Sequence, residues 1–324
     1  MSGLEIADIR VLDLPLTTSF RGLTTRELVV FKGSKRWAEF SAFVEYDDQE
    51  AANWLKAALS FANDDLPEIK REWIPVNATL PAVPLPEVDS VLGSFPGFRT
   101  VKIKVSENPG SKEQDLARIR HVFENYPGTK IRLDANGALR VNEAIEIIEE
   151  LGEIKLQYFE QPVRTIGELS QLREEIARRG LKTKIAADES IRKVSDPLRV
   201  AKEQAADIAV LKVQPLGGIA SAAAIAKQSG LEVVVSSALE SSLGIVQGLY
   251  LAASLDSLDY DCGLWTQNLL ADDIVAEPLE VLDASIKVSV PEIDLDKLER
   301  YRVTDDREKF WLERIERCRK LLEA

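Results

Sequence analysis

The chain has 324 residues, of which 54 are aspartate or glutamate and 41 are lysine or arginine, so its formal charge is −13 at pH 7. An excess of negative charge of this size repels nucleic-acid phosphates, which excludes DNA and RNA as expected partners. The single histidine, His121, excludes a zinc site of several imidazoles and a serine triad with a histidine to spare. Two cysteines without paired spacing, Cys262 and Cys318, predict a reducing compartment, and we expect the cytoplasm.

Membrane and targeting signals are absent from the sequence pattern. The opening stretch MSGLEIADIRVLDLPL lacks the basic segment, apolar run and small-residue cleavage site of a signal peptide. No apolar run approaches the ~18 residues of a spanning helix. With 45% hydrophobic and 29% charged residues, the composition is typical of a folded globular protein. We therefore expect a folded protein with no membrane or nucleic-acid partner, and no obligate protein partner is evident from the sequence.

The first part of the chain alternates apolar and polar positions, as in ELVVF (27–31) and WAEFSAFVEY (37–46), and then shows helical spacing in QEAANWLKAALSFA. These patterns predict a small α+β domain with antiparallel strands over residues 1–80. At the other end of the chain, residues 291–324 are highly charged and finish in a helical pattern. We expect this segment to pack back on the first domain.

From about residue 76, short apolar runs alternate with amphipathic stretches, the signature of βα repeats. Eight such strands predict a barrel of the (β/α)8 kind over residues 81–290, with its active site at the carboxyl ends of the strands. A doubly wound open sheet is the alternative, but neither GxGxxG nor GxxxxGK[ST] is present to support it. The eight runs are VNATLPAV (76–83), RTVKIKV (99–105), TKIRLDAN (129–136), LQYFEQP (156–162), KIAADES (184–190), IAVLKVQPL (208–216), LEVVVSSALE (231–240) and CGLWT (262–266).

Three acids fall at the ends of successive predicted strands: Asp134, Glu160 and Asp188, separated by 26 and 28 residues, or about one βα unit each. Acids brought together on one rim repel one another unless a cation lies between them. Oxygen ligands with no histidine or cysteine nearby favour Mg²⁺, with Mn²⁺ as the alternative. One such acid alone would more often be a helix N-cap or a turn residue, but three in register favour a metal site.

Three lysines accompany these acids. Lys102 and Lys104 lie two residues apart and so share one face of the second run, and Lys212 ends the sixth. Two ammonium groups side by side near a dication disfavour their own protonation, so one of them can act as a base. Lysines at solvated strand ends are the alternative, but the apolar flanks in VKIKV and VLKVQP favour buried strands. This set of groups suggests removal of a proton from the carbon next to a carboxylate, because a metal stabilises the resulting enediolate.

Two further polar residues, Arg132 and Asn136, each lie two positions from Asp134 and therefore share its face. They are candidates for contacts with the substrate or for support of the metal ligands. Their alternative roles are structural: an ion pair with a neighbouring acid for Arg132, and a turn with Gly137 for Asn136.

The order KxK, DxN, E, D and K on successive strands resembles the muconate-lactonizing-enzyme-like subgroup of the enolase superfamily, over nearly the whole chain. That superfamily is a known case of a lysine or histidine base beside Mg²⁺. The resemblance implies an N-terminal α+β capping domain, a modified (β/α)7β barrel, and a C-terminal segment that returns to the cap. It also implies that Lys104 is the base and that Lys102 and Lys212 support it. The implied metal ligands are Asp134, Glu160 and Asp188.

Within the subgroup, WAEFSAFVEY is similar to the GEFSPFxEY stretch of dehydratases of menaquinone biosynthesis, and RLDANG, SSALESSLG and CGLWTQNLL also match their pattern. This resemblance implies a syn elimination in which Lys104 removes the proton next to the carboxylate and returns a proton to the departing hydroxide. Lys212 would stabilise the enediolate. The implied substrate contacts are Ser236, Ser237, Gly263 and, from the first loop, Arg21, for which a solvated surface arginine is the alternative.

The stretch LDYDCGLWT leaves a second activity open. Asp259 and Asp261 could imitate the DxD motif with which dipeptide epimerases grip the substrate amine, although an acidic pair before a strand is more often a turn. The alternative functions are therefore racemisation of N-acylamino acids, epimerisation of dipeptides, and a barrel that only binds a carboxylate. The presence of all three lysines and all three acids speaks against the last.

Overall fold

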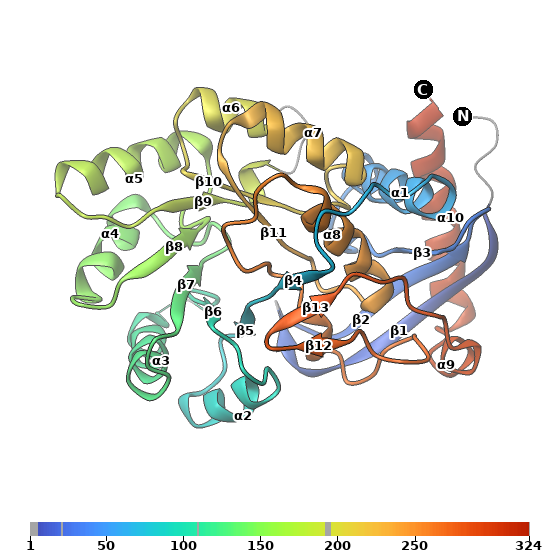
Figure 1. Cartoon of the computed structure of the whole chain (residues 1–324), viewed down its shortest axis with the longest axis horizontal. Coiled ribbons are helices and arrows are strands. Elements are labelled where there is room, and N and C mark those ends of the chain that lie inside the picture. The colour runs from blue at the N-terminus through green and yellow to red at the C-terminus, as the bar shows by residue number, and fades with distance from the viewer. Residues whose placement is uncertain (1–5, 21, 109, 192–195, 324) are drawn as a thin grey trace.

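The computed structural model describes residues 6–20, 22–108, 110–191 and 196–323. Its N-terminal part is a small α+β cap, as predicted, in which three antiparallel strands form a sheet in the order β1-β2-β3. The chain then enters a helix, α1, which follows Asp47 as its N-cap residue. Figure 1 shows the cap at the right, beside the larger barrel. Its elements are β1 (Ala7–Phe20), β2 (Leu23–Lys32), β3 (Trp37–Phe40) and α1 (Asp48–Asn63).

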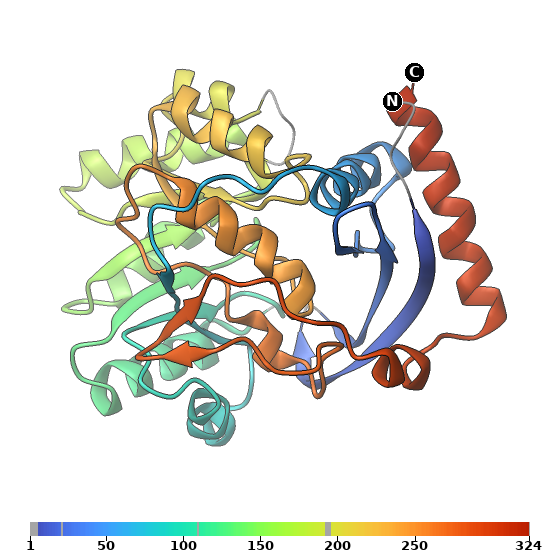
Figure 2. The same ribbon diagram turned by 45° about the vertical axis from the view of Figure 1, so that its right-hand side comes forward.

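The C-terminal segment returns to this cap, as predicted, through α9 (Leu295–Arg300) and α10 (Asp305–Glu323). Figure 2 shows α10 running along the cap, on the side away from the barrel. Trp311 is its anchor, since the indole is fully buried, lies edge-on to Phe40 at 5.8 Å between ring centroids, and donates a hydrogen bond to Glu27 at 3.1 Å. The two ends of the chain thus form one capping domain.

Removal of this anchor is expected to destabilise the cap. Trp311→Ala leaves a cavity beneath α10, and truncations of buried aromatic side chains typically lower the free energy of unfolding by about 3–5 kcal/mol. Urea denaturation measures the change. The matched control, Leu312→Ala on the same helix, removes a side chain that is 39% exposed and should cost less than about 1 kcal/mol. Equal losses in the two variants would contradict a cap held by Trp311.

The barrel is built on a parallel seven-stranded sheet in the order β11-β10-β9-β8-β7-β6-β5. All five residues of β6 are buried, because helices cover one side of the curved sheet and the barrel interior lies on the other. The strands are β5 (Ala78–Leu80), β6 (Thr100–Lys104), β7 (Lys130–Asp134), β8 (Leu156–Glu160), β9 (Ile185–Ala187), β10 (Ile208–Leu211) and β11 (Glu232–Val235). The helices are α2 (Val88–Gly93), α3 (Lys112–Asn125), α4 (Val141–Glu150), α5 (Ile166–Arg178), α6 (Asp196–Lys202), α7 (Ile219–Ser229) and α8 (Ser242–Ser254).

The eighth predicted strand, CGLWT, is not a regular strand. Two of its residues pair singly: Cys262 bridges Val76 just before β5, and Gly263 bridges Ser236 just after β11. Each residue pairs with a different neighbour, so no continuous ladder forms. Because this segment touches both edges of the sheet, the sheet curls toward closure as a barrel, which excludes the doubly wound open alternative.

A third, short sheet joins the two ends of the barrel part of the chain, in the order β12-β13-β4. Its strands are β4 (Trp73–Pro75), β12 (Val281–Leu282) and β13 (Ser285–Lys287). The first barrel strand, β5, occupies the last three residues of the range 1–80 predicted for the cap. The domain boundaries at residues 80 and 290 stay predictions. In the described part of the chain, no helix combines the length and apolarity needed to cross a membrane.

Candidate active site

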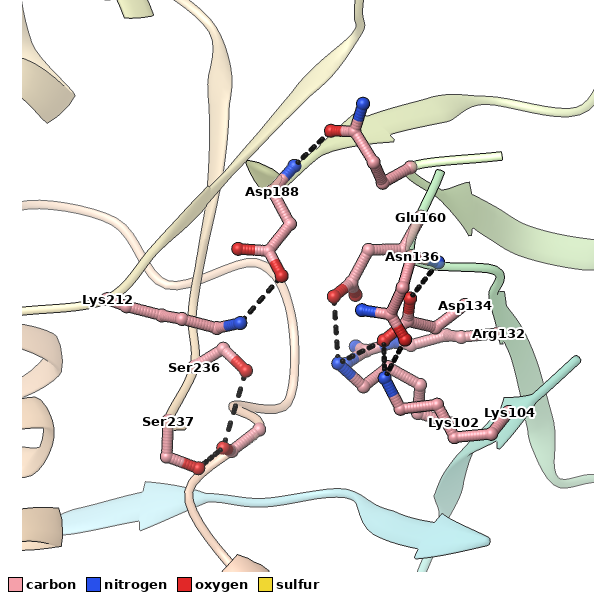
Figure 3. A network of polar contacts seen from close by, with 12 residues as sticks. Lys102, Lys104, Arg132, Asp134, Asn136, Glu160, Asp188, Lys212, Ser236 and Ser237 are labelled. Atoms are coloured by element: carbon pink, nitrogen blue, oxygen red, sulfur yellow. Dashed lines mark hydrogen bonds and ion pairs between the residues drawn. The ribbon is translucent and has the colours of Figure 1, made fainter. Parts of the chain in front are cut away.

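Five of the predicted site residues lie at one rim of the barrel. Lys104, Asp134 and Glu160 are the last residues of β6, β7 and β8, while Asp188 and Lys212 directly follow β9 and β10. The parallel register places Lys104 beside Asp134 and Asp134 beside Glu160. Figure 3 shows the side chains pointing toward one another across the mouth. The alternation of βα units predicted this arrangement, because the carboxyl ends of parallel strands meet at one edge.

Two lysines hold one carboxylate between them. Lys104 Nζ lies 2.6 Å from Asp134 Oδ2, and Lys102 Nζ lies 3.2 Å from the same oxygen. Lys102 also donates a hydrogen bond to Glu160 Oε1 at 2.9 Å. Both lysines are therefore on the interior face, as their spacing predicts. At 7% and 3% exposure, Lys102 and Lys104 are not solvated strand ends.

The third lysine faces them from the other side of the mouth (Figure 3). Lys212 Nζ donates to Asp188 Oδ2 at 2.6 Å. The backbone of Asp188 is fixed in turn, because its N–H donates to Gln161 Oε1 at 3.0 Å. Gln161 is fully buried and has a left-handed backbone (φ +34°), and its amide also donates to the Ser190 hydroxyl at 2.8 Å. Sequence reasoning missed Gln161; its position directly after Glu160 in FEQP was the available signal.

Burial and charge pull on the pKa values of these groups in opposite directions. For Asp134, burial opposes ionisation, but the neighbouring Lys104 and Lys102 ammonium groups hold its pKa well below the usual range. For Glu160, burial and repulsion by Asp134 raise the pKa to about 7, against the attraction of Lys102. For Lys102, burial acts to lower the pKa, but Glu160 and Asp134 raise it well above its ordinary value. Three buried carboxylates are thus balanced by three lysines.

One oxygen in this cluster lacks a partner. Glu160 Oε2 is buried and makes no hydrogen bond in the described residues, and such an oxygen costs about 1–3 kcal/mol. In the same described ranges, no group of three or more histidine, cysteine, aspartate or glutamate side chains is gathered closely enough to hold an ion as it stands. The acids are bonded to lysines instead. The donor chemistry, three carboxylates on adjacent strands with one oxygen unsatisfied, nevertheless fits a hard divalent cation.

Arg132 lies on β7 two residues before Asp134 and faces the barrel interior. Its guanidinium donates to Gln157 at 2.6 Å, to Asn77 at 2.8 Å and to the Asp261 carbonyl at 2.6 Å. It also lies 4.8 Å from the ring centroid of Tyr158 and is fully buried. These contacts connect β7 to neighbouring segments inside the barrel, on the side of the acids that faces away from the mouth. The ion pair considered for Arg132 is replaced by neutral acceptors, and its predicted contact with substrate stays a prediction.

Asn136 lies in the expected turn and also contacts two residues of the site. Its backbone is left-handed (φ +47°), as in a turn before Gly137, and its N–H donates to Asp134 Oδ1 at 3.1 Å. Its side-chain oxygen accepts from Lys104 at 2.6 Å. A cap residue missed by sequence reasoning, Phe20, also reaches this lysine, with its ring centroid 5.4 Å from Nζ. The adjacent Arg21 lies outside the described residues.

The predicted substrate contacts at the seventh strand lie together. Ser237 donates to the Gly263 carbonyl at 2.5 Å and lies 2.8 Å from the Thr266 hydroxyl, and the Ser236 hydroxyl is 3.5 Å from the same carbonyl. A side chain on Gly263 would overlap the Ser236 hydroxyl. The glycine therefore allows the close approach that closes the barrel next to these serines.

Comparison with known families fits this geometry. A family model for the enolase N-terminal domain-like fold matches residues 11–62, and one for the enolase C-terminal domain-like fold matches residues 94–292, which is more than half of the chain. The chain belongs to the enolase superfamily. Its strand-end lysines and acids lie within the second of these matches.

Curated relatives share nearly the full length. An o-succinylbenzoate synthase of Mycolicibacterium smegmatis is 45% identical over 315 residues, which cover 97% of this chain and 96% of the relative. The o-succinylbenzoate synthase of Mycobacterium tuberculosis is 44% identical, with 96% and 94% covered, and that of Mycobacterium leprae is 44% identical, with 98% and 93% covered.

Solved structures show the same superfamily fold. Muconate lactonizing enzyme from Pseudomonas fluorescens, complexed with muconolactone, aligns with a TM-score of 0.78 at 21% identity, covering 93% of this chain and 100% of that one. The enzyme from Pseudomonas putida aligns with a TM-score of 0.75 at 21% identity, with 92% and 99% covered. At this identity the likeness concerns the fold, namely a cap on a modified barrel.

Proposed function

We propose that the protein is a Mg²⁺-dependent lyase that dehydrates 2-succinyl-6-hydroxy-2,4-cyclohexadiene-1-carboxylate to 2-succinylbenzoate, a step of menaquinone biosynthesis. The observation that carries the proposal is the facing pair of lysines, Lys104 and Lys212, each bonded at 2.6 Å to one of the carboxylates at the strand ends. Full-length relatives named o-succinylbenzoate synthase, at 44–45% identity, support the choice of substrate.

In the proposed reaction, Lys104 acts as a neutral amine and takes the proton from the carbon next to the substrate carboxylate. The electron pair of that C–H bond moves into the carboxylate and gives an enediolate. The pair then returns to form the ring double bond as the C–O bond to the neighbouring hydroxyl breaks. Lys104 hands its proton to the departing hydroxide, so water leaves from the same face and the ring becomes aromatic.

Lys212 stabilises the enediolate from the opposite side by the positive charge of its ammonium group. Lys102 holds Asp134 and Glu160 in place beside the base. Asp134, Glu160 and Asp188 would hold Mg²⁺, or Mn²⁺ as the alternative; when bound, the ion supplies Lewis-acid stabilisation of the enediolate. The two hydroxyls of Ser236 and Ser237 would hold the succinyl carboxylate. Gly263 and Arg21 complete the proposed substrate contacts, and Arg132 would support them from below.

Loss of one proposed ligand should weaken metal binding. Asp188→Asn keeps the size of the side chain but removes its charge, so the affinity for Mg²⁺ in isothermal titration calorimetry is expected to fall at least about tenfold. Asp261→Asn is the matched control, because this aspartate accepts a hydrogen bond from Thr100 at the start of β6, away from the rim. An affinity for Mg²⁺ that is unaltered in Asp188→Asn would contradict its role as a ligand.

The proposed activity is tested directly by turnover. Purified protein with Mg²⁺ and the cyclohexadiene substrate should show aromatisation in the ultraviolet absorbance. Chelation of the metal should stop the reaction, and renewed Mg²⁺ should restore it. Absorbance that stays at the uncatalysed background would rule out the dehydratase.

Racemisation of N-acylamino acids is the second candidate, because lysines on opposite faces of one carbon could move a proton between them. Epimerisation of dipeptides is not supported by the position of Asp261, one of its two candidate amine-binding acids. Asp261 bonds Thr100, four residues or about 13 Å along β6 from Lys104. Deuterium incorporation at Cα of an N-acylamino acid in D₂O, without elimination, would favour the racemase.

We also propose a cytoplasmic location and a small carboxylate as the molecule that the protein binds. Both cysteines, Cys262 and Cys318, are free thiols and buried, which suits a reducing compartment. The charge of −13 still disfavours nucleic acid as a partner.

A further inference from the structure

A glutamate of the cap reaches the loop that follows the two predicted carboxylate-binding serines. Glu39 lies in β3 and is 1% exposed. One of its oxygens accepts from the Ser41 hydroxyl at 2.6 Å. The other accepts from the backbone N–H of Ser241 at 3.2 Å and also from the Ser241 hydroxyl. Ser241 is the N-cap residue of the barrel helix α8. A carboxylate of the capping domain therefore accepts hydrogen bonds at the N-terminus of a barrel helix, where negative charge is favourable.

A buried arginine of the cap donates a hydrogen bond to the same loop. Arg26 of β2 is 2% exposed, and its Nε donates to the Leu239 carbonyl at 3.0 Å, while another of its nitrogens donates to the Ser41 carbonyl. Its guanidinium carbon lies 4.0 Å from the ring centroid of Phe43. Leu239 has a left-handed backbone (φ +65°), which costs a residue other than glycine about 1 kcal/mol. The cap therefore stabilises an unfavourable backbone conformation in the barrel loop.

Cap and barrel interlock tightly at this point. Glu240 is fully buried, and one of its oxygens accepts from the Ala238 N–H at 2.7 Å. A Cβ on Gly244, in the first turns of α8, would lie 2.5 Å from Glu240 Cβ and 2.8 Å from Glu39 Oε1. Only glycine fits there. The junction thus tolerates little displacement of Glu39 relative to α8.

The loop is short and is held at both ends. It begins with Ser236 and Ser237, whose hydroxyls contact the Gly263 carbonyl, and it ends at Ser241 on Glu39. A shift of one end of so short a segment moves the serines, and a misplacement of about 1 Å in a binding group can cost a large factor in activity.

We propose that Glu39 and Arg26 are positioning residues that lock the cap onto the 236–241 loop, and so fix the site for the remote carboxylate of the substrate. The inference rests on the proposed function, which assigns Ser236 and Ser237 to that carboxylate. In the described part of the chain, Glu39 and Arg26 form hydrogen bonds with Ser41 and the 236–241 loop rather than with the lysines or acids of the rim. Their loss should therefore raise KM for the substrate and leave proton transfer and metal binding nearly unchanged.

Glu39→Ala tests the proposal, with Glu27→Ala as the matched control. Glu27 lies next to Arg26 on β2 but faces α10, where it bonds Arg307 at 2.7 Å, so its loss weakens the cap without touching the loop. Glu39→Ala is expected to raise KM about tenfold, with kcat within about threefold of the parent and Mg²⁺ affinity unchanged. Glu39→Gln, whose amide oxygen can still accept from Ser241, should recover most of the affinity and guards against a variant that does not fold.

Amide hydrogen exchange of residues 236–243 gives a second readout that needs no turnover. Exchange there should be about tenfold faster in Glu39→Ala and unchanged in Glu27→Ala. If wild-type protein fails to turn over the substrate, the proposed function fails, and the exchange data alone decide whether the lock exists. Equal KM values and equal exchange in Glu39→Ala and Glu27→Ala would overturn the proposal.

Discussion

Lys104→Ala is expected to abolish dehydration, with kcat lowered about 10⁴-fold, because the variant has no group to take the proton and none to return one to hydroxide. Mg²⁺ and product should still bind, since Asp134, Glu160 and Asp188 remain. Turnover by absorbance and binding by calorimetry separate the two effects. Lys130→Ala is the control, because this exposed lysine begins β7 at the opposite end of the strand from Asp134. Turnover close to that of wild type in Lys104→Ala would remove this lysine from the mechanism.

Lys212→Ala is expected to lower kcat about 10²–10³-fold, the usual loss when one fixed charge that stabilises a transition state is removed. Lys212 faces the base across the mouth and bonds Asp188, not Asp134. The base therefore stays in place, and KM should change less than kcat. Steady-state kinetics at saturating Mg²⁺ measure both constants. A rise in KM with kcat unchanged would mean that Lys212 binds the substrate and does not stabilise the enediolate.

The positions of the strand-end residues could be predicted from the sequence because they depend on local pattern alone. The runs that end in Lys104, Asp134 and Glu160 are apolar and evenly spaced, and parallel strands joined by helices must bring their ends to one rim. The shared face of Lys102 and Lys104 followed from strand periodicity in the same way. The roles of these residues remain proposals.

Individual contacts between residues of distant segments could not be predicted. Arg132 shares a face with Asp134, but its direction down into the barrel is set by Asn77 and Asp261, each more than fifty residues away. The last predicted strand reduces to two bridges because Cys262 pairs with Val76 and Gly263 pairs with Ser236, at opposite edges of the sheet. The residue pattern within one segment does not specify which distant residues that segment will contact.

The junction between cap and barrel shows the same limit. The motif WAEFSAFVEY is visible in the sequence, but only the fold brings Glu39 to Ser241, which lies 202 residues away. An acid among the apolar residues of this strand is the local signal that the sequence offers.

A crystal structure with Mg²⁺ and 2-succinylbenzoate bound tests the central claim most directly. The account predicts the ion on the carboxylates of Asp134, Glu160 and Asp188, and Lys104 Nζ directed at the ring carbon that carries the carboxylate. Lys212 should lie on the opposite face of the ring. A metal bound elsewhere, or a ring carbon turned away from Lys104, would contradict it.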